Sequence, residues 1–174
     1  MKIIISSKPG VGKTTLVKEL ISKLKVTICG FYTEEIRENG KRVGFKVVNL
    51  ENKEEVVLAH VYLEGPKKVG KYKVNIKDFE PMAINILEKA IKGKEELIII
   101  DEIGKMELFS KVFRQLVIRL LNSPKNVIFT IKTDWVKNWI PKIRDKDIYN
   151  FDMSRQNYTE TLEEIQEVLS DSIQ

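Results

Sequence analysis

Residues 6–15 read SSKPGVGKTT, and they join two segments with different hydrophobic patterns. Before them, residues 2–6 (KIIIS) form a short apolar run without alternation, which indicates a buried parallel strand. After them, residues 13–25 place apolar side chains on one helical face and lysines on the other, which predicts an amphipathic helix. The local order is therefore strand, glycine-rich loop, helix.

The loop carries most of the pattern G-x-x-x-x-G-K-[ST], which is typical of a phosphate-binding loop. Backbone N–H groups at a helix N-terminus, helped by the helix dipole, supply the donors that phosphates need. Gly10 and Gly12 have no Cβ, so the chain can curl around a phosphate. Lys13 is expected to reach the β- and γ-phosphates, Thr14 to offer its hydroxyl to Mg²⁺, and Thr15 to approach the α-phosphate. The predicted binding residues of this segment are Ser7, Lys8, Pro9, Gly10, Val11, Gly12, Lys13, Thr14 and Thr15.

Ser7 stands where the pattern has its first glycine. This position lies where the strand turns into the loop, and it needs a small residue. Serine is small, and its hydroxyl can satisfy a local backbone group. A chance Gly-Lys-Thr in a turn is the alternative, but the strand before the motif and the helix after it argue against chance. We therefore predict a working phosphate-binding loop.

A second motif, LIIIDEIG at residues 97–104, ends a hydrophobic strand in two carboxylates. Asp101 can hold Mg²⁺ beside Thr14, and Glu102 can polarise a water for attack on a γ-phosphate. A strand that merely ends in solvated acids is the alternative. The pair favours an ATPase with a catalytic glutamate, and because no N-K-x-D motif is present we expect loose base discrimination. The motif itself thus predicts Asp101 and Glu102 as functional residues.

Several other polar residues are candidates with an alternative beside each. Lys105 could stabilise γ-phosphate charge or be a solvated loop lysine. Thr130 could sense the γ-phosphate or be a satisfied core hydroxyl. The arginine-finger candidates are Arg37, Arg42, which could instead pair with Glu38, and Arg144. The residues expected to serve packing are Cys29, His60, Trp135 and Trp139.

The remaining segments alternate between short apolar strands and amphipathic helices, which predicts a three-layer αβα fold with a mostly parallel sheet. Asn39-Gly40 indicates a hairpin that adds antiparallel strands at one edge. The further expected strands are 26–33, 55–61, 97–101, 126–131 and 147–152. The further expected helices are one capped by Asp78 and running to about Lys92, 110–122, one capped by Asp134 before Pro141, and 158–170. Residues 62–77 are expected to be a loop, and the chain, 1–174, a single domain.

Composition limits the functional classes. The 174 residues are 43% hydrophobic and 32% charged, and no stretch approaches 18 apolar residues, so we expect no membrane span. A single cysteine excludes a disulfide framework and fits a cytoplasmic location, while a single histidine excludes a multi-histidine metal site. The net charge of +5 suits anionic ligands such as nucleotides and also permits weak nucleic-acid binding. Because the lysines are scattered, a solvated surface is favoured.

Four stretches together resemble a known family. They are PGVGKTTL (9–16), GFYTEEIRENGKRVGFKVV (30–48), LIIIDEIGKMELFS (97–110) and FDMSRQNYTETL (151–162), and they span nearly the whole chain. The sequence resembles the THEP-type, or cancer-related, nucleoside-triphosphatases, from which it departs at Ser7 and at Gln156-Asn157. The resemblance implies Mg²⁺-dependent hydrolysis of ATP, GTP, CTP and UTP to diphosphate and phosphate. It also implies that Ser7 through Thr14 bind the nucleotide and that Glu102 activates water. The second set of nucleotide-binding residues that it implies is Leu97, Ile98, Ile99, Ile100, Asp101, Glu102, Ile103 and Gly104.

Two alternatives remain open at the level of sequence. A nucleoside or nucleotide kinase uses the same loop to transfer the γ-phosphate to an acceptor other than water, but its usual arginine-rich lid has no counterpart among six unclustered arginines. The second alternative is a nucleic-acid-dependent ATPase, for which the positive charge and the hairpin are the supporting features. This alternative predicts that RNA or DNA raises turnover. The expected oligomeric state is a monomer or a weak oligomer.

Overall fold

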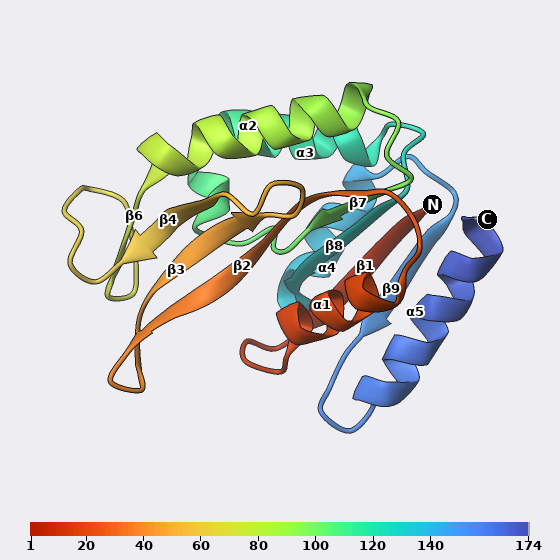
Figure 1. The fold of residues 1–174 in the computed structure, drawn as a ribbon, viewed down its shortest axis with the longest axis horizontal. Helices are drawn as coiled ribbons and strands as arrows, with labels where there is room; N and C mark the ends of the chain where they lie inside the picture. Colours follow the sequence, from red (N-terminus) through yellow and green to blue (C-terminus); the bar gives the residue numbers. More distant parts are fainter. Residues whose placement is uncertain (174) are drawn as a thin grey trace.

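The computed structural model describes residues 1–173, and a nine-stranded sheet runs through it between two layers of helices (Figure 1). The spatial order of the strands is β5-β6-β4-β3-β2-β7-β8-β1-β9. The strands are β1 (Lys2–Ser7), β2 (Ile28–Glu38), β3 (Lys41–Asn49), β4 (Glu55–His60), β5 (Lys68–Val69), β6 (Tyr72–Val74), β7 (Leu97–Ile100), β8 (Val127–Lys132) and β9 (Ile148–Asp152). From β2 to β9 in this order neighbouring strands are parallel, and from β2 to β5 they are antiparallel.

Helices cover both faces of the sheet, so the predicted three-layer αβα fold with a mostly parallel sheet and an added antiparallel hairpin is confirmed. The helices are α1 (Lys13–Lys23), α2 (Ile76–Lys92), α3 (Lys111–Leu121), α4 (Thr133–Trp139) and α5 (Tyr158–Ser172), with short 3₁₀ turns at Glu107–Phe109 and Ile140–Lys142. Helices α2 and α3 lie on one face, and α1 and α5 lie on the other (Figure 1). Because strand side chains alternate, Ile4 joins the core under α2 and α3, while Ile3 and Ile5 join the core under α1 and α5.

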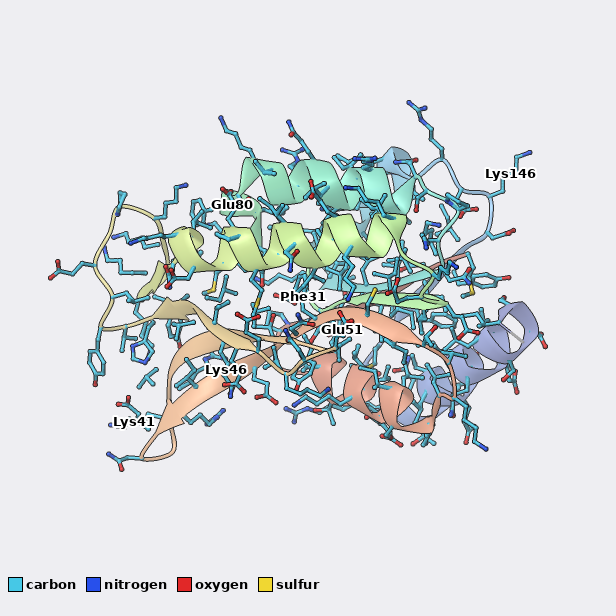
Figure 2. The ribbon with its side chains drawn as sticks, turned by 45° about the horizontal axis from the view of Figure 1, so that its top comes forward. Phe31, Lys41, Lys46, Glu51, Glu80 and Lys146 are labelled. Carbon is cyan, nitrogen blue, oxygen red and sulfur yellow. The ribbon has the colours of Figure 1, made fainter. Side chains whose placement is uncertain are left out.

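The core under α2 is built around aromatic rings. Phe31 of β2 contacts Phe79 of α2 and Phe113 of α3, with ring centroids 6.3 and 6.0 Å apart. Figure 2 shows Phe31 beneath α2, at the centre of the sheet. All three rings are completely buried. This core fixes β2 and β7 under the helical layer, and it thereby fixes the ends of the strands from which the loops emerge.

The strands β7, β8 and β1 are parallel neighbours in the sheet, so their carboxyl ends lie side by side. The glycine-rich loop follows β1, and the Asp-Glu pair follows β7. In open parallel sheets, ligands bind just outside the carboxyl ends of the strands. The topology therefore brings the two sequence motifs together although some ninety residues separate them.

The hairpin β2–β3 turns at Asn39-Gly40, as predicted, and both residues have positive φ (48° and 75°). Only Ile28–Phe31 of β2 pairs with β7, so the rest of β2 extends with β3 beyond the parallel part of the sheet (Figure 1). Lys41 lies near the outer end of this hairpin (Figure 2). β4 adds the third antiparallel strand that the sequence predicted.

The structure corrects one expected loop. Residues 62–77 contain the small antiparallel pair β5 and β6, which extends the sheet beyond β4. These strands have two and three residues, so they are too short to show an alternating pattern in the sequence. Tyr72 is buried here, with its ring 5.1 Å from that of Phe45.

Two predicted helix caps were also wrong. Helix α2 starts after Asn75, whose side-chain oxygen accepts a hydrogen bond from the N–H of Asp78. Asp78 thus lies in the first turn and receives the cap. Similarly, α4 begins directly after β8 with Lys132 at the N-cap, so Asp134 lies in its first turn. An acidic residue stabilises the first turn as well as the cap position, which is why the sequence alone placed both helix starts too late.

Within the described residues, no helix combines the length and the apolar composition needed to cross a membrane.

Candidate functional site

Ser7 ends β1, and its hydroxyl connects the strand to the loop that follows. The side chain is completely buried, and Oγ donates a hydrogen bond to the carbonyl oxygen of Lys8 (2.8 Å). This confirms the expected bond to a local backbone group. The same Oγ accepts a hydrogen bond from Lys13 Nζ at 3.2 Å, which the sequence did not predict. Among the described residues, those other than glycine with positive φ are Asn39 and Lys53, so Ser7 adopts its backbone conformation without strain.

Gly10 and Gly12 give the loop its shape, because both have positive φ (75° and 115°). A side chain would be strained at either position. Gly12 is also the N-cap of α1 and has no side chain with which to cap the helix. The first N–H groups of a helix have no intrahelical acceptor, so they are open to an anion here.

Lys13 is the first residue of α1, and its side chain points back along the loop. Only 8% of it is exposed, and Nζ lies 3.2 Å from Ser7 Oγ and 3.8 Å from Glu102 Oε2. An ammonium group has three N–H donors, and in the part of the chain that the structure describes one of them is directed to Ser7. Nζ therefore lies between the end of β1 and Glu102 of the second motif.

Asp101 is the residue on which the neighbouring strands converge. Its carboxylate is buried, Oδ2 accepts a hydrogen bond from Thr14 Oγ1 at 2.6 Å, and Oδ1 accepts one from Thr130 Oγ1. Thr33 of β2 donates to its backbone carbonyl at 2.8 Å. Burial raises the pKa of Asp101, and the hydroxyls of Thr130 and Thr14 and the charge of Lys13 act in the opposite direction. The structure therefore brings together Thr14 and Asp101, the two predicted metal ligands.

Glu102 lies nearer to the surface than Asp101, with 31% of its side chain exposed. Burial raises the pKa of Glu102, the charge of Lys13 lowers it, and the carboxylate of Asp101 raises it again. A raised pKa makes a carboxylate a stronger proton acceptor. Glu102 therefore combines partial exposure, a cation at 3.8 Å and increased basicity.

Glu107 also lies in this site, and the sequence analysis did not select it. Its side chain is 2% exposed, and its carboxyl group lies beside Gly104 and close to Glu102. Burial raises the pKa of Glu107 well above its ordinary value, and the charge of Glu102 raises it further. An acidic residue five positions after Glu102 in a loop is normally solvated, so the only signal in the sequence was its place within DEIGKMEL.

The other predicted binding residues lie at different depths. Lys8, Pro9 and Gly10 are exposed on the loop, and Thr15 is exposed in the first turn of α1. Ile103 is buried in the core under α2 and α3. Leu97–Ile100 are completely buried, so their side chains support Asp101 from the core and do not line the site. Lys105 is exposed, and within residues 1–173 it forms no ion pair.

The three candidate arginines lie apart from this cluster. Arg37 and Arg42 are on the hairpin, and both form ion pairs with Glu35, so the alternative pairing of Arg42 with Glu38 was wrong. Arg42 also donates to Tyr72 Oη at 3.0 Å. Arg144 precedes β9, which is parallel to β1, so it lies near the amino ends of these strands, whereas the glycine-rich loop follows the carboxyl end of β1.

The residues expected to serve packing behave as structural groups. Trp139 is 4% exposed in the core beside α4, and Trp135 packs against the same core. Cys29 is buried, which raises the pKa of its thiol to about 12, so the thiolate is scarce at neutral pH. His60 stacks against Tyr62 with ring centroids 5.2 Å apart and accepts a hydrogen bond from its N–H.

A loop with two left-handed glycines, an inward lysine and a threonine bound to a strand-end aspartate defines the class of P-loop nucleotide-binding proteins. Comparison with known proteins narrows this class. A family model described as NTPase matches residues 2–166. The chain is 48% identical over 170 residues to nucleoside-triphosphatase THEP1 of Thermotoga sp. (strain RQ2), an alignment that covers 97% of this chain and 95% of the relative.

The similarity extends to a human protein and to solved structures. The chain is 38% identical over 178 residues to the human cancer-related nucleoside-triphosphatase, covering 94% of this chain and 93% of that one. The crystal structure of THEP1 from Aquifex aeolicus superposes with a TM-score of 0.85 at 41% identity, covering 97% of this chain and 99% of that one. The solution structure of the human protein gives 0.81 at 36% identity and covers 99% of each chain. This chain belongs to the THEP1-type nucleoside-triphosphatase family, a family of hydrolases.

Proposed function

We propose that the protein hydrolyses ATP, GTP, CTP and UTP to the diphosphate and inorganic phosphate with Mg²⁺, and that Glu102 activates the attacking water. The observation that carries this proposal is the position of Glu102, whose Oε2 lies 3.8 Å from Lys13 Nζ at the end of the glycine-rich loop. A carboxylate beside the cation that binds the γ-phosphate is placed to take a proton from a water in line with that phosphate. The family relationship supports the same reaction.

The phosphate-binding part of the proposal rests on the loop and on α1. The open N–H groups at the start of α1 would bind the phosphates, and Lys13 would turn its donors from Ser7 to the β- and γ-phosphate oxygens. Lys105, exposed on the loop after Glu102, is proposed as a second cation for the γ-phosphate. All of these groups bind phosphate and none of them reads a base, which supports a broad range of nucleotides.

The donor chemistry beside the loop fits Mg²⁺, which prefers hard oxygen ligands and few protein groups. Thr14 Oγ1 and Asp101 Oδ2 are 2.6 Å apart, so a threonine hydroxyl and a carboxylate already lie together. These two residues would hold the ion. When bound, Mg²⁺ offsets the negative charge of the β- and γ-phosphates.

The test is the variant Glu102→Gln, assayed for phosphate release and for nucleotide binding. Glutamine keeps the size of the side chain but cannot accept the proton, so turnover should fall on the order of 100-fold or more while nucleotide affinity stays within about threefold. The matched control is Glu34→Gln, because Glu34 is 29% exposed and also lies beside a lysine, Lys18. This control should leave turnover unchanged.

Two results would contradict the proposal. Near-normal turnover in Glu102→Gln would remove the role of Glu102 as the water activator. Phosphate transfer that requires a second nucleotide or another acceptor would identify a kinase instead of a hydrolase.

Addition of RNA or DNA at low salt should leave turnover unchanged. A nucleic-acid-dependent ATPase would instead be stimulated, and salt would remove the stimulation.

A further inference from the structure

We propose that Glu107 is a positioning residue for Glu102: its buried carboxyl group holds the carboxylate of Glu102 in the orientation needed to activate water. This inference rests on the proposed function of Glu102, and it concerns a residue that does not itself touch the nucleotide. The two glutamates come from one short segment, between the end of β7 and the start of α3.

The first argument is the space that both carboxyl groups share. A Cβ built on Gly104 would lie 2.6 Å from Glu107 Oε2 and 2.8 Å from Glu102 Oε1. The two carboxyl groups thus converge on the volume that Gly104 leaves empty. Gly104 is not among the described glycines with positive φ, so its backbone does not require glycine. An alanine methyl group would lie within 3 Å of both carboxyl groups, so both side chains would have to move.

The second argument is that this segment is firmly held on either side. The N–H of Ile103 donates to the carbonyl of Thr130 on β8 at 3.0 Å, and Ile103 is completely buried. The N–H of Leu108 donates to the carbonyl of Gly104 at 3.1 Å and closes the turn. Glu107 lies inside this turn, and only 2% of its side chain is exposed. The turn and the burial together restrict where its carboxyl group can lie.

The third argument is the charge balance. A third carboxylate close to those of Glu102 and Asp101 would be strongly disfavoured in a buried position. Burial and the charge of Glu102 raise the pKa of Glu107 well above its ordinary value. A neutral carboxyl group keeps an O–H donor, and an oxygen of Glu102 borders the same space beside Gly104. Neutral Glu107 can therefore donate a hydrogen bond to the carboxylate of Glu102, which leaves the other oxygen of Glu102 for water.

A merely structural role for Glu107 would also explain a buried carboxyl group in a turn. The two roles differ in what they do to Glu102. A positioning role acts through Glu102 and disappears when Glu102 is already disabled, whereas a structural role lowers stability regardless of Glu102. A double-mutant cycle separates them.

The experiment measures single-turnover hydrolysis and nucleotide affinity, with Mg²⁺ and ATP, for Glu107→Ala and Glu107→Gln in the wild type and in Glu102→Gln. Glu107→Ala should lower the rate by about tenfold or more with affinity within about threefold. Glu107→Gln should restore the rate to within about threefold of the wild type, because an amide both donates and accepts. In the Glu102→Gln background, Glu107→Ala should have no further effect.

Two further variants keep the test decisive if Glu107→Ala folds poorly. Gly104→Ala pushes the carboxyl groups apart, so it should lower the rate while nucleotide affinity remains. Lys2→Met is the control for loss of a buried polar group. Lys2 is completely buried at the amino end of β1, at the other end of the strand from the glycine-rich loop. It should lower stability and leave the rate of the folded protein unchanged.

The possible outcomes separate the two hypotheses. A normal rate in Glu107→Ala or in Gly104→Ala overturns the positioning role, and so does an equal loss in both backgrounds. If Glu102→Gln itself keeps full turnover, the proposed function of Glu102 fails and the inference fails with it. If Glu102→Gln loses turnover while Glu107→Ala does not, only the inference fails.

Discussion

Two buried lysines, Lys2 and Lys13, lie at opposite ends of the first strand and its loop. Their ammonium groups differ in the number and distance of their hydrogen-bond partners in the protein. Lys2 is completely buried at the start of β1, and its Nζ donates to the carbonyl oxygens of Ser123 (3.0 Å) and Lys125 (2.5 Å) and to Asp145 Oδ2 (2.9 Å). Lys13 is 8% exposed at the end of the loop. Its partners are Ser7 Oγ at 3.2 Å and a carboxylate oxygen at 3.8 Å.

The difference shows how a structural lysine and a binding lysine can be distinguished. A buried ammonium group that uses all three donors is compensated, and it holds neighbouring segments together. A buried ammonium group with long or missing partners carries a desolvation cost that a bound anion relieves. Lys2 belongs to the first kind and Lys13 to the second, although a count of buried charges would treat them alike.

The largest expected effect comes from removing the binding lysine. Lys13→Ala should lower turnover about 100-fold to 1,000-fold and weaken nucleotide binding as well, because Lys13 would contact the phosphates both before and during the reaction. The melting temperature should change little, since Lys13 has few partners in the protein. Hydrolysis and nucleotide titration check this prediction. A large loss of stability with normal binding would place Lys13 with Lys2 as a structural residue.

A smaller effect is expected at the structural lysine, where Asp145→Asn removes the charged partner of Lys2. Because Lys2 keeps two carbonyl acceptors and 22% of Asp145 is exposed, we expect a loss of about 2 kcal/mol in unfolding free energy. Turnover of the folded protein should not change. Thermal and denaturant unfolding measure the loss, with activity assayed below the transition.

The same pair predicts a pH dependence. Lys2 holds the pKa of Asp145 at about 2 in the folded protein, below its ordinary value of about 4. A lowered pKa stabilises the folded state above the unfolded pKa, and this contribution is lost as the pH falls through the folded pKa. The stability gap between wild type and Asp145→Asn should therefore be complete at neutral pH and shrink between about pH 4 and pH 2. A gap that does not depend on pH would show that packing, and not charge, explains the loss.

The sequence predicted the parts of the site that depend on contiguous residues. The glycines, Lys13 and Thr14 follow one strand directly, and Asp101 and Glu102 follow another, so each motif is visible within about ten residues. The parallel arrangement of the strands then brings the motifs together. The alternation of strands and helices was sufficient to predict a mostly parallel sheet, while the order of its strands came from the structure.

The parts that were missed depend on contacts across the fold. The burial of Glu107 follows from the volume left by Gly104, and nothing in the local pattern distinguishes it from a solvated acid. The short strand β6 pairs with β4, and β5 pairs only with β6 among the described strands, so these strands depend on pairing that their own short sequences do not reveal. Likewise, Lys2 resembles a basic residue before an apolar run, and its three partners come from segments 121 to 143 residues away.

The comparison extends to the aspartates beside the two lysines. Asp145 is held by ammonium groups, while Asp101 is held by the hydroxyls of Thr14 and Thr130. If these hydroxyls orient Asp101 for Mg²⁺, Thr130→Val should weaken the apparent Mg²⁺ affinity about tenfold in hydrolysis assays. Thr161→Val is the matched control, because Thr161 is a buried threonine on α5. Unchanged Mg²⁺ dependence in Thr130→Val would make Thr130 a core hydroxyl only.

The smallest expected effect comes from changing Ser7, the hydrogen-bond acceptor of Lys13. Ser7→Gly restores the glycine of the motif and removes one partner of Lys13. We expect a loss of about 1 kcal/mol in stability, because the bond to the Lys8 carbonyl is lost and glycine is more flexible. Nucleotide affinity should change by less than about threefold, since in the proposed function phosphate oxygens would replace Ser7 as acceptors for Lys13. Unfolding and nucleotide titration measure the two effects. An affinity loss as large as that of Lys13→Ala would show that Ser7 positions Lys13, and the departure from the motif would then be functional.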